Sequence, residues 1–185
     1  MKTTLHQAAA RFPGLGRCAT LLVLAAGFSL SACGQTLQLV SGLDGSQVAP
    51  AGGGGDSLAP VVSPDGRYVL FASTANNLCL ATNNAPLPAH FPAPLNVFLR
   101  DRSNATTVLV SVNLSGVAGG NGDSLPVDLS TDGRYAVFES SASDLVPGDT
   151  NNATDVFVRD LVSGSTTLVN ISTNGLPGNG ASRSR

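Results

Sequence analysis

Histidine, lysine and helical periodicity are scarce in this 185-residue sequence. The two histidines are His6 and His90, and no G-x-S-x-G segment occurs, so the sequence offers no Ser-His-Asp set. No window keeps a helical period over three turns. Glycine, serine, threonine and asparagine are abundant, which is typical of short strands joined by turns. The sequence therefore predicts an all-β protein that is not an enzyme.

Lysine does not occur after Lys2, and the chain beyond residue 32 is acidic. All twelve acidic residues lie there, against seven of the ten basic ones, which gives a formal charge of about −5. An acidic chain is poorly suited to neutralising phosphates. We therefore expect no nucleic-acid partner.

Residues 1–32 have the pattern of a secretory signal peptide. A basic start precedes an apolar run at 19–30 that is too short to span a bilayer, and small residues follow. The segment L-S-A-C at 30–33 resembles the bacterial lipobox, in which the cysteine takes the lipid and becomes the mature N-terminus. We predict lipidation of Cys33, with ordinary signal cleavage as the alternative. Gly34 stands where many inner-membrane lipoproteins have aspartate, so the resemblance points to the outer membrane.

A segment that combines a turn and a strand occurs twice. It reads S-P-D-G-R-Y-V-L-F-A-S at 63–73 and S-T-D-G-R-Y-A-V-F-E-S at 130–140. The serine can cap the turn, and Asp-Gly supplies a short polar residue and then one that adopts positive φ. The apolar run that follows suits a strand buried on both faces. The recurrence predicts a repeat protein with Phe71 and Phe138 in equivalent buried positions between repeats.

Two further segments also recur. N-V-F-L-R-D at 96–101 returns as D-V-F-V-R-D at 155–160, and T-T-V-L-V-S at 106–111 returns as T-T-L-V-N-I at 166–171. Each repeat thus holds four strands, expected at 59–63, 67–73, 96–101 and 106–111, and again at 125–130, 134–140, 155–160 and 166–171. Four antiparallel strands per repeat is the arrangement of a propeller blade.

These motifs resemble the repeats of bacterial TolB-like β-propeller proteins. The stretch S-D-L-V-P-G-D-T-N at 143–151 is also similar to a linker common among their envelope relatives. The resemblance covers residues 39–182 and implies a partial β-propeller of about two blades. Its parts are a tether with the tail strand of a preceding unit at 33–58, blades at 59–111 and 112–171, and the start of a truncated third unit at 172–185. Such propellers serve as binding platforms, sensor domains and covers for hydrolase domains.

Glycine-rich stretches lie at 52–57 and 119–124. They lack the lysine of a phosphate-binding loop, so we expect crossovers from the outer strand of one blade to the inner strand of the next. A proline-rich insertion at 85–94 cannot join the interior of a sheet and is expected to protrude as a loop. His90 on this loop is expected to be solvated rather than a ligand.

Cys79 occupies the position that corresponds to Val146 of the second repeat. One interpretation is a small, buried apolar residue. The other is a disulfide to another chain or to a part of the protein outside this sequence, in an oxidising envelope.

Asp149, Asn151 and Asp155 place oxygen-bearing side chains in a pattern that resembles the start of calcium-binding loops. The segment departs from those loops at Ala153 and lacks their glycine and their bidentate glutamate. The alternative is an Asx-rich hairpin loop whose side chains cap their own backbone. Calcium is the one cofactor that the sequence brings into consideration.

The sequence and the resemblance together imply a lipid-anchored, non-catalytic scaffold for a protein partner in the bacterial cell envelope. We expect an outer-membrane lipoprotein that faces the periplasm or the surface and is a fragment of a longer propeller. A homo-oligomer that completes the ring is the alternative to truncation. Two other functions stay open: the N-terminal propeller part of a larger envelope peptidase, and a calcium-stabilised surface protein.

Overall fold

A computed structural model describes residues 53–183 of the chain, and within that range it contains eight β-strands and no helix. No segment of this described range is therefore a helix that could cross a membrane. The predicted signal peptide, the lipidation site Cys33 and the strand tail at 39–41 lie outside the described residues.

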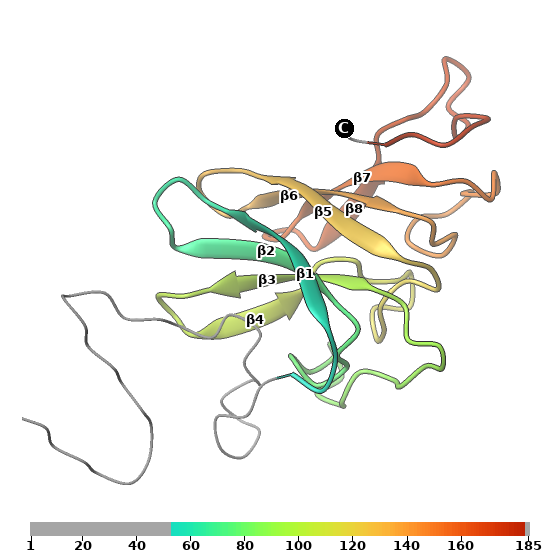
Figure 1. The fold of residues 1–185 in the computed structure, drawn as a ribbon. Helices are drawn as coiled ribbons and strands as arrows, with labels where there is room; N and C mark the ends of the chain where they lie inside the picture. Colours follow the sequence, from blue (N-terminus) through green and yellow to red (C-terminus); the bar gives the residue numbers. More distant parts are fainter. Residues whose placement is uncertain (1–52, 184–185) are drawn as a thin grey trace, which may run out of the picture. The chain divides into compact units, whose positions relative to one another are not determined.

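The strands form two sheets that follow the order of the chain, β1-β2-β3-β4 and β5-β6-β7-β8 (Figure 1). All neighbouring strands are antiparallel. The bounds are β1 (Ser57–Val62), β2 (Tyr68–Ser73), β3 (Asn96–Asp101), β4 (Thr106–Leu109), β5 (Ser124–Leu129), β6 (Tyr135–Ser140), β7 (Asp155–Asp160) and β8 (Ser165–Leu168). For residues 53–183, the prediction of an all-β fold with two sets of four antiparallel strands is confirmed.

The turn between β1 and β2 has the predicted chemistry. The Ser63 hydroxyl donates to Asp65 Oδ1 at 2.6 Å and accepts from the Tyr68 amide at 2.9 Å. Gly66 has a φ of 70°, a conformation that costs glycine little. The turn between β5 and β6, at 130–135, repeats these hydrogen bonds and the positive φ.

An ion pair closes the corner of each sheet. Arg67 donates to both carboxylate oxygens of Asp101, at 3.2 and 2.8 Å, and Arg134 does the same to Asp160, at 3.1 and 2.9 Å. The hydrogen bond from Arg67 lowers the pKa of Asp101 from 3.8 to about 2. The equivalent bond from Arg134 also lowers the pKa of Asp160. In each repeat, a bidentate, charge-assisted contact therefore links the residue before the second strand to the last residue of the third strand.

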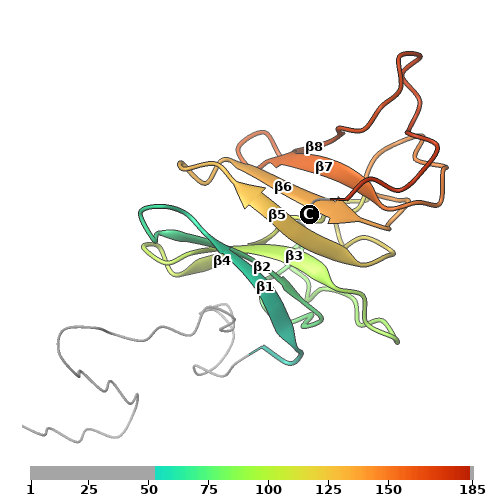
Figure 2. The same ribbon diagram turned by 45° about the horizontal axis from the view of Figure 1, so that its top comes forward.

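The two sheets pack face to face, and β5 is the strand of the second sheet that contacts β1, β2 and β3 (Figures 1 and 2). We call the buried apolar residues that join the sheets the shared cluster. Its members are Leu70, Val97, Leu99 and Val110 from the first repeat and Leu129, Ala136, Phe138, Ala142, Leu145, Val146, Phe157 and Leu168 from the second. Phe138 is fully buried there and stacks on Phe157 with ring centroids 5.5 Å apart.

The opposite face of the first sheet forms a separate core, which we call the insertion cluster. It contains Phe71, Ala75, Leu78, Cys79, Ala81, Leu87 and Phe98. Phe71 and Phe98 pair across β2 and β3 and stack at 5.9 Å, as Phe138 and Phe157 do in the second sheet. The two phenylalanines singled out by the sequence thus hold equivalent buried places, but Phe71 packs against the segment between β2 and β3. Cys79 is buried in this cluster, which agrees with the apolar interpretation.

Candidate functional site

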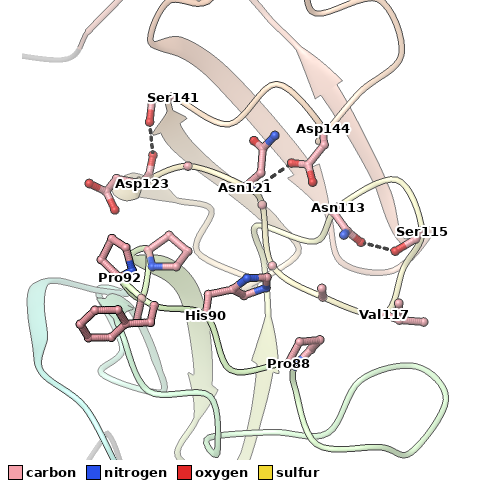
Figure 3. A pocket seen from close by; sticks show the side chains of 17 residues that line it. Pro88, His90, Pro92, Asn113, Ser115, Val117, Asn121, Asp123, Ser141 and Asp144 are labelled. Atoms are coloured by element: carbon pink, nitrogen blue, oxygen red, sulfur yellow. Dashed lines mark hydrogen bonds between the residues drawn. The ribbon is translucent and has the colours of Figure 1, made fainter.

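A hollow in the described region, which we call the insertion groove, has a volume of about 700 Å³. One wall is the proline-rich insertion and the other is the joint between β4 and β5 with the loop after β6 (Figure 3). Its lining residues are Pro88, His90, Phe91, Pro92, Ala93, Pro94, Asn113, Ser115, Val117, Ala118, Gly119, Gly120, Asn121, Gly122, Asp123, Ser141 and Asp144.

The insertion is fixed at its base and exposed at its tip. Leu87 is buried in the insertion cluster, and its carbonyl accepts a hydrogen bond from Asn76 Nδ2 at 3.3 Å. His90 and Phe91 are exposed beyond it, and Phe91 is fully exposed. Proline limits the backbone freedom of this tip. The structure thus confirms that this segment contributes no strand to either sheet and that His90 is exposed.

The facing wall is polar, and its side chains are held by backbone hydrogen bonds. Asp144 Oδ1 accepts from the Asn121 amide at 2.9 Å, and Asp123 Oδ1 accepts from the Leu95 amide at 2.9 Å. Asn121 also exchanges two hydrogen bonds with Ser143. Of the described residues that line the groove, two are carboxylates and none is lysine or arginine, so this wall carries negative charge opposite an apolar, proline-rich wall.

Residues 110–123 lead from the edge strand β4 of the first sheet to the edge strand β5 of the second. The glycine-rich stretch at 119–124 is therefore a crossover between sheets, as predicted. Its role in the groove was not predicted. The joint contacts the segment between β2 and β3 directly, because Thr82 Oγ1 donates to the Gly116 carbonyl at 2.6 Å.

Asp149, Asn151 and Asp155 lie close together in the structure. The Asp155 carboxylate accepts hydrogen bonds from the side-chain amides of two asparagines. Asn151 Nδ2 donates to Asp155 Oδ2 at 2.8 Å, while Asn170 Nδ2 donates to Asp155 Oδ1. The other ends of these amides accept from the Ala153 and Val156 amides, which fixes their orientation. The loop therefore has the capped, Asx-rich form. Calcium binding stays a prediction, and it would require these amide donors to move.

Burial and the negative charge of Asp155 raise the pKa of Asp149. A raised native pKa means that the folded state holds this proton more tightly than the unfolded state does. The contribution of Asp149 to stability is therefore complete below its ordinary pKa of 3.8 and is lost as the pH rises through the raised value. Within residues 53–183 no group of three or more histidine, cysteine, aspartate or glutamate side chains is placed to hold a metal ion.

No protein-family model matches this chain, and a search of curated proteins also finds no match.

Proposed function

We propose that the chain is a lipid-anchored β-propeller-repeat protein of TolB-like type that binds a protein partner in the cell envelope without catalysing a reaction. Two sheets with the same strand order, turn chemistry and corner ion pair, packed face to face, support the assignment of each sheet as a blade. The lipid anchor comes from the lipobox pattern that ends at Cys33.

The observation that carries the binding role is the exposed tip of the insertion. A fully solvated phenylalanine on a proline-rich loop lies at the edge of a 700 Å³ groove. Aromatic side chains supply large contact area at interfaces for little entropy loss, and proline reduces that loss further. The segment between β6 and β7 of the second repeat has no such insertion, so the tip is an addition to the repeat rather than a part of its packing.

The lining of the groove indicates the chemistry of the partner. Phe91 and the prolines offer apolar contact, while Asp123 and Asp144 on the facing wall favour a cationic or hydrogen-bond-donating group. A protein segment with an apolar side chain next to a lysine or arginine meets both requirements. Electrostatic attraction of this kind weakens with added salt.

Site-specific crosslinking tests the proposal. A photoreactive phenylalanine analogue at position 91 is expected to give a discrete adduct in cells, and excess purified protein should compete for that adduct. The matched control carries the analogue at Val162, which is also highly exposed but lies in the turn between β7 and β8.

A competitor that carries Phe91→Ala should fail to remove the adduct, since it lacks the aromatic anchor. Equal adducts from positions 91 and 162, or equal competition by the wild type and Phe91→Ala, would count against a binding role for the insertion groove.

A further inference from the structure

Another hollow in the described region, which we call the β4 pocket, has a volume of about 330 Å³ and lies along the edge strand of the first sheet. Thr107, Val108 and Leu109 of β4 all line it, because the outer edge of β4 pairs with no strand of the described region. The segment between β2 and β3, the joint after β4 and Arg159 of the second sheet complete its walls. The β4 pocket shares no residue with the insertion groove.

Arg159 brings a positive charge to the β4 pocket. It lies on β7, on the same face of the sheet as Phe157, which packs in the shared cluster. Its Nη1 donates to Thr166 Oγ1 at 2.9 Å, whereas its Nε is buried and has no hydrogen-bond partner. No carboxylate of residues 53–183 forms an ion pair with Arg159. The pocket therefore contains a partly buried guanidinium whose charge this part of the chain does not neutralise.

The rest of the lining is uncharged and mostly apolar. Of the described residues that line the β4 pocket, none is aspartate, glutamate or lysine, and Cys79, Ala81 and Leu87 are buried apolar residues. Thr107 adds a polar group that is 4% exposed. Its hydroxyl accepts a hydrogen bond from Arg100 Nη1 at 3.1 Å, so its own proton is left for donation. An apolar hollow with a few polar groups is the usual form of a small-molecule site.

The charge of Arg159 indicates an anionic ligand. Removing an arginine from water without a partner is costly, and a carboxylate offsets part of that cost through charge-assisted hydrogen bonds. One guanidinium and one hydroxyl match a single negative charge, whereas a phosphate group would bring up to about two charges and three acceptor oxygens. The apolar remainder of the lining suits a hydrocarbon tail, and a volume of 330 Å³ lies at the small end of ligand sites.

We propose that the β4 pocket binds a small carboxylic acid with an apolar tail. Its carboxylate accepts hydrogen bonds from Arg159 and Thr107, and its tail packs against Cys79, Ala81 and Leu87. Such a ligand contacts the first repeat through β4 and the second through Arg159, so it stabilises the packing of the two sheets. The site is independent of partner binding at the insertion groove.

A titration with hexanoate, followed by nuclear magnetic resonance, tests the proposal. The Nε–Hε resonance of Arg159, assigned through its side chain, should shift and reach saturation, because this group has no partner within the protein. Acetate lacks the tail and hexanamide lacks the charge. Each should therefore bind at least about tenfold more weakly than hexanoate.

Two variants assign the binding to the proposed groups. Arg159→Met removes the charge and should weaken hexanoate binding by about ten- to a hundredfold. Thr107→Val keeps the shape of the side chain and should weaken binding by a smaller factor, because it removes an uncharged donor. The matched control is Arg102→Met, which removes an exposed arginine outside the β4 pocket and should leave hexanoate binding unchanged.

Equal binding of hexanoate and acetate, or equal affinities of Arg159→Met and Arg102→Met, overturns the proposal. The titration of the natural protein needs no variant, so it decides the matter even if Arg159→Met fails to fold. An Arg159 resonance that no concentration of hexanoate shifts overturns the proposal as well. A short peptide with a free C-terminal leucine that binds far more tightly than hexanoate overturns it in favour of a protein C-terminus as the ligand.

Discussion

Replacing Gly133 with alanine should destabilise the protein far more than replacing Gly66 with alanine. The two glycines occupy equivalent positions in the turns of the two repeats, with φ of 71° at Gly133 and 70° at Gly66. They differ in surroundings, because the added Cβ would meet the Tyr68 ring at 2.7 Å at Gly133, whereas its nearest neighbour at Gly66 is Arg102 Nη1 at 3.6 Å. Gly66→Ala therefore isolates the backbone cost, and Gly133→Ala adds a steric clash between the sheets.

The expected magnitudes follow from these two contributions. A left-handed conformation costs a residue with a Cβ atom about 1–2 kcal/mol, which is our estimate for Gly66→Ala. Overpacking a closed contact costs about 1–3 kcal/mol more, so Gly133→Ala should lose about 2–5 kcal/mol of unfolding free energy. The aromatic ring of Tyr68 cannot yield easily, since it packs against the shared cluster.

Urea unfolding followed by far-ultraviolet circular dichroism measures both variants. A double-mutant cycle with Tyr68→Ala then assigns the extra loss, because removing the ring removes the clash and the coupling should reach about 0.5–3 kcal/mol. If Gly66→Ala and Gly133→Ala are equally destabilising, Tyr68 does not lie against the turn of the second repeat, and the contact between the sheets at Gly133 is wrong.

Three further predictions concern other parts of the chain. Phe138→Ala should lower the unfolding free energy by about 3–5 kcal/mol, because the side chain is fully buried in the shared cluster; a loss below about 1 kcal/mol would contradict this placement. Cys33→Ser should release the protein from the membrane fraction, since each lipid methylene contributes about 0.8 kcal/mol to anchoring, and a variant that withstands a salt and carbonate wash would contradict lipidation. Lowering the pH from about 4 to about 2 should reduce the melting temperature, because the native pKa of Asp101 is depressed from 3.8 to about 2 and its stabilising contribution is lost as the carboxylate is protonated. Arg67→Met should remove part of that dependence, and an unchanged slope would show that the ion pair is unimportant for it.

The local parts of the fold were predictable from the sequence. Ser63, Asp65 and Gly66 form a turn through contacts that span only a few residues, so their order in the chain specifies the geometry. Strand ends were less predictable. The strand expected at 106–111 ends at Leu109, because the Val110 and Ser111 amides both donate to the Val97 carbonyl and leave the regular ladder.

The insertion groove could not be predicted, because its walls come from segments that are distant in the sequence. The proline-rich insertion and the glycine-rich joint were each recognisable by composition, but only their packing across the first sheet places them opposite each other. The surroundings of the candidate calcium ligands could not be predicted either, because one contact comes from a residue that is distant in the sequence. Asn170 follows β8 and reaches back to Asp155 at the start of β7, and the pattern at 149–155 gives no sign of that contact.

The distribution of the two apolar cores has a consequence for the order in which the protein opens. The first sheet is supported on both faces, by the shared cluster and by the insertion cluster, whereas among residues 53–183 a buried apolar cluster covers only one face of the second sheet. In a stacked array, the free energy of opening a unit contains its own stability and one contribution from each neighbour. Amide hydrogens in β6 and β7 should therefore exchange through a sub-global opening that has a lower free energy than the opening that exposes β2 and β3. The chain would then unravel from its C-terminal sheet toward its N-terminal one.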